Sequence, residues 1–111
     1  MSFVYAGRGI TAGLRGQRNI KVMLLAAMAV VVLGVYLDIT REEWTLLALA
    51  MGLVLSLEMV NTAGERLVDI LSPGHDSRYG RIKDILAGAV LIAALTAAVV
   101  GGLVFGPRLF G

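Results

Sequence analysis

The sequence predicts an all-α integral membrane protein with three transmembrane helices and a short amino-terminal interfacial amphipathic helix. Of its 111 residues, 58% are hydrophobic and only 16% are charged, and the mean hydropathy of +0.83 lies above the range of ordinary soluble domains. Three apolar stretches approach or exceed the length needed to cross a bilayer, at residues 22–37, 44–66 and 85–105. The length of the chain suits a single domain over residues 1–111.

Composition excludes several classes of function. The formal net charge of +2 is too small to indicate nucleic-acid binding, and the absence of cysteine excludes disulfides and thiolate metal sites. His75 is the one histidine, so a histidine-rich metal cluster is excluded as well. We expect no signal peptide, because the first apolar run follows a basic stretch and no small-residue cleavage site closes it.

Residues 1–21 are predicted to lie in the membrane interface. Basic side chains alternate here with apolar ones, as in interfacial amphipathic helices, at Arg8, Arg15, Arg18 and Lys21. Four glycines in the segment weaken the helix prediction. They permit either close helix packing or a phosphate-binding loop, although their spacing matches neither G-x-G-x-x-G nor a Walker A motif.

The first two spans are joined by a short polar turn over residues 38–43. Thr40 with Glu43 three residues later fits a capping box, which predicts that the second helix starts near Arg41. This helix is expected to run to Leu71, and at about 45 Å it exceeds the bilayer core of about 30 Å. Its last turns should therefore stand outside the membrane, beyond about residue 66.

A loop over residues 72–80 should separate the second helix from the third span, since Pro73 and Gly74 stop a helix. The third span repeats small residues at every fourth position, a pattern that lets helices pack closely in lipid. One row is Ala89, Ala93, Ala97 and Gly101, and a second is Ala94, Ala98 and Gly102. The tail from Pro107 to Gly111 should lie beyond the span.

Basic residues predict the orientation of the chain. The amino-terminal segment holds four Arg or Lys residues and the loop region 72–84 holds three, whereas the turn and the tail hold one each. The positive-inside rule places the first two of these regions in the cytoplasm and the carboxyl terminus outside. The expected location is the bacterial inner membrane, with several passes and a cytoplasmic amino terminus.

A polar stripe enters the apolar second helix. At 100° per residue, Glu58, Asn61, Glu65 and Asp69 fall on one helix face. Polar residues within a membrane helix are costly and usually functional. A carboxylate at Glu58 can accept a proton from a lipid hydroxyl, while Glu65 or Asp69 can hold Mg²⁺, which prefers oxygen ligands and substrate phosphates.

Lys83 and Asp84, at the cytoplasmic start of the third span, supply further parts for phosphoryl transfer. Lys83 can contact a nucleotide phosphate, and Asp84 can orient a donor or help the metal. Simpler roles stay open for all these residues. Glu58 and Asn61 can form hydrogen bonds between helices. Glu65 and Asp69 can belong to a solvated helix end. Lys83 and Asp84 can be an anchor at the membrane interface and a helix N-cap.

These motifs resemble the signature of the small prokaryotic integral-membrane lipid kinases, the diacylglycerol kinase and undecaprenol kinase family. The resemblance runs from Ser2-Phe3 to the end of the third span, and the stretch Gly80–Ala94 is similar to the Gram-positive-type branch, which is linked to undecaprenol. The residues that carry it are Glu58-x-x-Asn61-Thr62-Ala63-x-Glu65-x-x-x-Asp69 and Lys83-Asp84.

The resemblance implies an ATP- and Mg²⁺-dependent lipid kinase that forms a homotrimer, with sites between neighbouring subunits. It implies that Glu58 is the catalytic base, that Glu65 binds metal and nucleotide, and that Asn61 and Asp69 support the site. Nucleotide contacts are implied at Tyr5, Gly74, His75, Asp76, Lys83 and Asp84. Gln17 stands where the family has its second metal-binding glutamate, and is the expected metal and nucleotide contact in that segment.

The expected reaction is phosphorylation of undecaprenol to undecaprenyl phosphate. The alternative substrate is diacylglycerol, which would give phosphatidic acid. Because Gln17 lacks the charge of glutamate, a weakened or non-catalytic relative is a further alternative. Two alternatives come from other functional classes. One is a membrane assembly protein that does not bind ATP, and the other is a small ion-translocating oligomer that uses Glu58.

Overall fold

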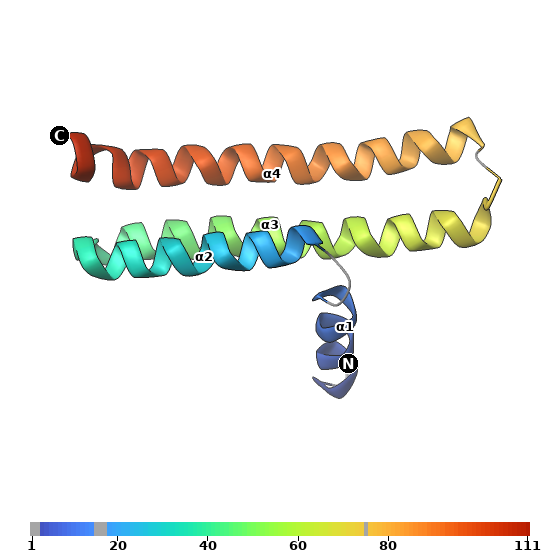
Figure 1. The fold of residues 1–111 in the computed structure, drawn as a ribbon, viewed down its shortest axis with the longest axis horizontal. Coiled ribbons are helices and arrows are strands. Elements are labelled where there is room, and N and C mark those ends of the chain that lie inside the picture. The colour runs from blue at the N-terminus through green and yellow to red at the C-terminus, as the bar shows by residue number, and fades with distance from the viewer. Residues whose placement is uncertain (1–2, 15–17, 75) are drawn as a thin grey trace.

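A computed structural model describes residues 3–14, 18–74 and 76–111 of the chain. The described residues form four helices and no strand: α1 (Phe3–Leu14), α2 (Arg18–Leu37), α3 (Arg41–Leu71) and α4 (Ser77–Phe110). Figure 1 shows α3 and α4 as long antiparallel neighbours, α2 alongside the first part of α3, and α1 crosswise to this bundle. The predicted all-α architecture, with three long helices and a short amino-terminal one, is confirmed.

The three long helices are apolar and long enough to cross a membrane. Their outward faces carry exposed large apolar side chains, among them Val32 (67% exposed), Leu49 (68%) and Ile92 (68%). Such a surface is unfavourable in water but matches the hydrocarbon of a bilayer. Each helix extends beyond the span predicted for it, since α2 starts at Arg18 and α4 runs from Ser77 to Phe110.

The turn between α2 and α3 forms as its sequence indicates. Asp38 adopts a positive φ of 52° just after α2, the left-handed conformation with which many helices end. Ile39 N–H donates to the Gly34 carbonyl at 3.2 Å. Thr40 then caps α3: its hydroxyl accepts from Glu43 N–H at 3.1 Å, and its own N–H donates to the Glu43 carboxylate at 2.9 Å. The predicted capping box is confirmed.

The start of α4 corrects one prediction. Residues 77–80 were expected to belong to the loop, but they form the first turn of the helix. Asp76 is the N-cap, and its carboxylate accepts from Arg78 N–H at 2.9 Å. Its carbonyl also accepts from Tyr79 N–H and Gly80 N–H at 3.1 Å. An aspartate cap is strong enough to start the helix before Gly80.

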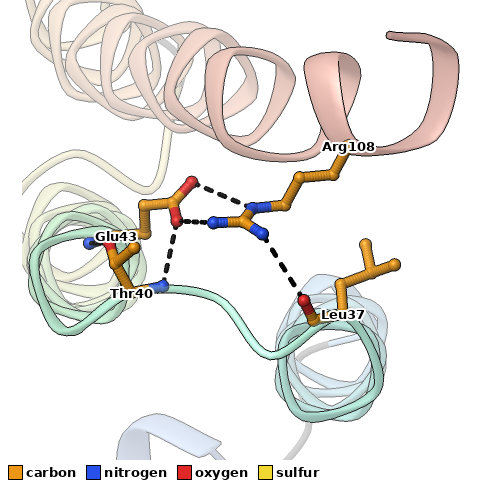
Figure 2. A network of polar contacts seen from close by, with 4 residues as sticks. All are labelled: Leu37, Thr40, Glu43 and Arg108. Atoms are coloured by element: carbon orange, nitrogen blue, oxygen red, sulfur yellow. Dashed lines mark hydrogen bonds and ion pairs between the residues drawn. The ribbon is translucent and has the colours of Figure 1, made fainter.

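The end of α4 lies beyond the predicted span of residues 85–105, because the helix continues through Pro107 to Phe110. A proline inside a helix clashes with the preceding turn, and Gly106 before it has no Cβ to add to that clash. Arg108 holds this last turn against the bundle through Glu43 and Leu37 (Figure 2). These contacts explain why the helix does not end at the proline.

The apolar core lies at the end of the bundle that holds the α2–α3 turn. Its buried members are Ile39, Leu47, Val104 and Phe105, with Trp44 and other partly buried side chains packed around them. Along α3, one continuous buried face leads from this core toward the other end of the bundle. It consists of Leu47, Ala50, Val54, Glu58, Asn61, Thr62 and Val68, so the apolar face of α3 is interrupted by polar residues from Glu58 to Thr62.

Candidate active site

The predicted polar stripe lies on the inward face of α3. Glu58 is 4% exposed, Asn61 9% and Thr62 3%, whereas Glu65 is half-buried and Asp69 is exposed. The burial follows the helical period, because residues three and four apart share a face of the helix. The stripe therefore grades from a buried carboxylate at Glu58 to a solvated one at Asp69.

Asn61 and Glu65 form a pair within the stripe. Asn61 Nδ2 donates a hydrogen bond of 3.2 Å to Glu65 Oε1, which orients that carboxylate. Asn61 Oδ1 is buried and has no hydrogen-bond partner in the part of the chain that the structure describes. A buried carbonyl oxygen without a partner is costly. The pair thus offers a carboxylate and a free amide oxygen at adjacent positions, which are ligand types that Mg²⁺ accepts.

Lys83 brings α4 into the site. Its ammonium lies 2.5 Å from the Asp69 carboxylate, with both side chains partly exposed. Lys83 and the end of the α3 stripe come together because α3 and α4 are antiparallel neighbours. Asp84, the next residue, is exposed and makes no ion pair with another described residue.

A polar cavity of about 460 Å³ opens beside this ion pair. Asp69 and Lys83 line it together with residues of the α3–α4 loop, including Asp76. Arg78 hydrogen-bonds the Asp76 side chain, with Nη2 2.9 Å from Oδ2, and this contact lowers the pKa of the Asp76 carboxyl below its ordinary value. Asp76 therefore stays ionised at neutral pH, and it is already engaged as a cap and ion-pair partner.

Two of the predicted nucleotide contacts, Tyr5 and Gly74, do not line this cavity. Tyr5 lies on α1 and is 69% exposed, and the guanidinium of Arg8 lies 5.8 Å from its ring centroid. No interaction within the described ranges joins Tyr5 to the loop cavity. Gly74 lies in the loop, and its position is open, with no atom within 4 Å of an added Cβ. The predicted contacts at Gln17 and His75 fall outside the described residues.

An apolar cavity of about 320 Å³ lies between α2, α3 and α4, on the other side of Glu58. Its α3 lining ends with Val54 and Leu55, one turn before Glu58. From α4 it takes small side chains of both predicted rows, including Ala94, Ala97 and Gly101. Glu58 thus stands where an apolar cavity gives way to polar residues, which suits a ligand with an apolar body and a polar end.

Sequence reasoning missed several residues that line these cavities. Ser72 and Tyr79 line the polar cavity, and both continue helical rows already identified: Ser72 follows Asp69 by three residues, and Tyr79 precedes Lys83 by four. Arg66 lines a third cavity, of about 380 Å³, between α3 and α1. It was interpreted only as the point where α3 leaves the membrane.

The metal-binding capacity of the described residues is small. No group of three or more Asp, Glu or His side chains lies close enough together to hold a metal ion in the ranges that the structure describes. Glu65 and Asn61 supply oxygen ligands from two side chains. Mg²⁺ is commonly held by one or two carboxylates, with water and substrate phosphates completing its shell, so this donor set fits Mg²⁺ together with a phosphate ligand.

Fold and site together define a small helical membrane protein with a buried carboxylate between an apolar and a polar cavity. The family model described as prokaryotic diacylglycerol kinase matches residues 4–105. The chain is 39% identical to the undecaprenol kinase of Bacillus subtilis (strain 168), over 97% of this chain and 88% of the relative. It is 36% identical to a diacylglycerol kinase of Synechocystis, over 98% and 63%.

The diacylglycerol kinase of Escherichia coli (strain K12) is 30% identical, over 86% of this chain and 78% of the relative. The family match covers nearly the whole chain, including every described part of the polar stripe. The chain belongs to the prokaryotic diacylglycerol kinase family. It is a lipid kinase, as the resemblance in its sequence implied.

Proposed function

We propose that this lipid kinase transfers the γ-phosphoryl group of ATP to the hydroxyl of undecaprenol. The main support for this proposal is the position of Glu58, which is 4% exposed and lies between an apolar cavity and the Asn61–Glu65 pair. A lipid alcohol fits this arrangement. Its apolar body would lie in the apolar cavity, and its hydroxyl would lie beside Glu58 and the Asn61–Glu65 pair. The 39% identity to an undecaprenol kinase favours undecaprenol over diacylglycerol.

Glu58 is the proposed catalytic base. It accepts the proton of the lipid hydroxyl as the oxygen attacks the γ-phosphorus of ATP, and the bond from that phosphorus to the β-phosphate oxygen breaks. ADP leaves with the electron pair of that bond. General-base catalysis of this kind contributes about 10²–10⁴-fold to rate, and a carboxylate placed beside the acceptor oxygen needs no further reorganisation.

Glu65 and Asn61 are the residues that would hold Mg²⁺, and Gln17 is the proposed ligand from the amino-terminal segment. When bound, Mg²⁺ supplies neutralisation of charge on the transferring phosphate oxygens. Asn61 keeps Glu65 oriented through its 3.2 Å hydrogen bond. This leaves Asn61 Oδ1 free toward the metal or a water of its shell.

Lys83 is the proposed phosphate contact, because this cationic side chain lines the polar cavity at the end of the stripe. Asp69 holds its ammonium in place before nucleotide binds. Asp84, Asp76, Gly74, His75 and Tyr5 are proposed to complete the nucleotide site. Tyr5 would have to reach it by a movement of α1 or from a neighbouring subunit.

The polar end of the bundle is proposed to face the cytoplasm, where ATP is found. The basic residues favour this orientation, and α1 lies crosswise beside Met59, Thr62 and Arg66 of α3. An interfacial helix at that level would put Glu58 just inside the hydrocarbon and Asp69 outside it. We propose the bacterial inner membrane as the location and a homotrimer as the working assembly.

The test is a comparison of two lipid alcohols in one membrane. The purified protein would be reconstituted in liposomes that contain undecaprenol or diacylglycerol at equal mole fraction, with Mg²⁺ and ATP labelled in the γ-phosphate. We expect label in undecaprenyl phosphate with the higher kcat/KM. Preferential labelling of diacylglycerol would reverse the substrate assignment. ATP binding without label in either lipid would instead indicate a non-catalytic relative.

A further inference from the structure

The end of the bundle opposite the polar cavity is closed by an ion pair between α4 and α3. Arg108 Nη2 and Nε contact the two carboxylate oxygens of Glu43, with Nε 3.3 Å from Oε2. Arg108 Nη1 also lies 3.5 Å from the Leu37 carbonyl oxygen at the end of α2. Figure 2 shows this guanidinium between the two segments. Two parallel contacts to one carboxylate fix geometry more strictly than a single contact does.

The second ion pair between α3 and α4 is that of Asp69 with Lys83, at the polar end. The two pairs are matched in spacing. At 1.5 Å per residue, Glu43 and Asp69 are about 39 Å apart along α3, and Lys83 and Arg108 are about 38 Å apart along α4. In an antiparallel pair of helices, equal spacings allow both ion pairs to form in one register only.

The surface between these ion pairs does not define the register as strictly. The small residues of α4 recur every four positions, so sliding α4 by one turn places small residues on the sites of other small residues. An added Cβ at Gly64 would contact the Leu86 side chain, so Leu86 fills the space over this glycine. A shift of one turn would bring Ile82 or Val90, also branched and apolar, to that space.

We propose that the Glu43–Arg108 ion pair sets the register of α4 against α3, and that Arg108 is thereby a positioning residue for Lys83. One-turn displacements of about 5.4 Å are a known mode of helix movement. Such a displacement would carry Lys83 away from Asp69 and from the polar cavity. The link to catalysis rests on the proposed nucleotide role of Lys83, whereas the register itself does not.

Cysteine crosslinking can report the register directly, because the natural chain has no cysteine. Gly64→Cys with Leu86→Cys forms the in-register pair. Gly64→Cys with Val90→Cys forms the pair shifted by one turn, with Leu86→Ala added to leave room for the sulfur. Each pair would be oxidised in liposomes and quantified by mass spectrometry, with Arg108 intact or changed to Gln. Arg41→Gln, which removes an exposed cation at the same end, is the matched control.

We expect the in-register disulfide to dominate while Arg108 is intact and in the Arg41→Gln control. Arg108→Gln should lower the ratio of in-register to shifted disulfide by about tenfold, the effect expected for a charge-assisted contact. The same substitution, in the chain without cysteines, should raise the KM for ATP more than it lowers kcat. Glu43→Gln should act in the same direction if Arg108→Gln does not fold, since glutamine preserves the capping box.

An unchanged disulfide ratio after both substitutions would overturn the proposal. A disulfide that joins two chains rather than one would also overturn it, because α4 would then pair with α3 of another subunit. A changed ratio with an unchanged KM for ATP would refute the positioning role of Arg108. Absence of kinase activity in the natural chain would contradict the proposed function, while the disulfide ratio would still test the register.

Discussion

The Lys83 ammonium lies 2.5 Å from the Asp69 carboxylate, and this contact joins the start of α4 to the last turns of α3. The two residues are 14 positions apart in sequence, and the antiparallel packing of their helices brings them to one cavity. The contact is partly solvated, with side-chain exposures of 38% and 65%. An ion pair of this kind contributes only about 0–1 kcal/mol to stability, so its importance lies in placing the cation.

Lys83→Gln should therefore affect nucleotide binding far more than folding. We expect the KM for ATP to rise by about tenfold or more, because one charge-assisted contact to phosphate is lost. The melting temperature should stay close to that of the natural chain. Arg81→Gln, which removes an exposed cation five residues after the Asp76 cap, is the control and should leave the KM for ATP unchanged. An equal rise in both variants would indicate a general effect of charge.

Glu58→Gln should abolish most of the phosphoryl transfer. The amide cannot accept the proton of the lipid hydroxyl, so kcat should fall by about 10²–10⁴-fold, while the similar volume of glutamine preserves packing. Turnover would be measured with labelled ATP, and folding by circular dichroism in detergent. Glu42→Gln, at an exposed position outside the site, provides the control. Full activity of Glu58→Gln would show that another group takes the proton.

Asn61→Ala should weaken the response to Mg²⁺. The substitution removes the 3.2 Å hydrogen bond that orients Glu65 and also removes the buried Oδ1. We expect half-maximal activity at about tenfold higher Mg²⁺, the effect of one lost contact to a charged group. Asn61→Asp, which retains an oxygen there, should have the smaller effect at saturating Mg²⁺. Identical Mg²⁺ titrations for Asn61→Ala and the natural chain would place Asn61 outside the metal shell.

Gly34→Ala should destabilise the core end of the bundle. An added Cβ would lie 2.6 Å from Trp44 Cη2, closer than carbon atoms pack, and 3.1 Å from Ile39 Cδ1, a tight contact. Overpacking of this kind costs about 1–3 kcal/mol, which would be measured by unfolding in mixed detergent. Gly52→Ala, where no atom lies within 4 Å of the new Cβ, should be neutral or stabilising, because alanine favours a helix. Equal losses in both variants would contradict the packing explanation.

The cap at Asp76 should respond to acid. Its pKa is lowered from the ordinary 3.8, mainly by the Arg78 side chain. A lowered folded-state pKa gives stabilisation that is complete above the ordinary pKa and is lost as the pH falls through the lowered value. Protection of the first amides of α4 from hydrogen exchange, corrected for intrinsic rates, should fall over that window. Asp76→Asn keeps the cap without titrating, so a similar loss in that variant would exclude Asp76 as the cause.

The candidate site could be predicted residue by residue only where one helix carries it. The period of Glu58, Asn61 and Glu65 fixes a common face of α3, because a helix turns 100° per residue. The sequence could not show that Asn61 binds Glu65, nor that its Oδ1 lacks a partner among the described residues. Those facts depend on rotamers and on the neighbouring helix.

The sequence by itself determined the helices, their apolar faces and most of their ends. Thr40 and Glu43 fix the start of α3, and Pro73 with Gly74 fixes its end, because capping and helix-breaking act over a few neighbouring residues. The tertiary structure alone decided the course of α4. Arg108 reaches Glu43 and extends the helix through Pro107, a contact between segments 65 residues apart that no local pattern encodes. It also decided that Lys83 meets Asp69, since that contact depends on the register of two packed helices.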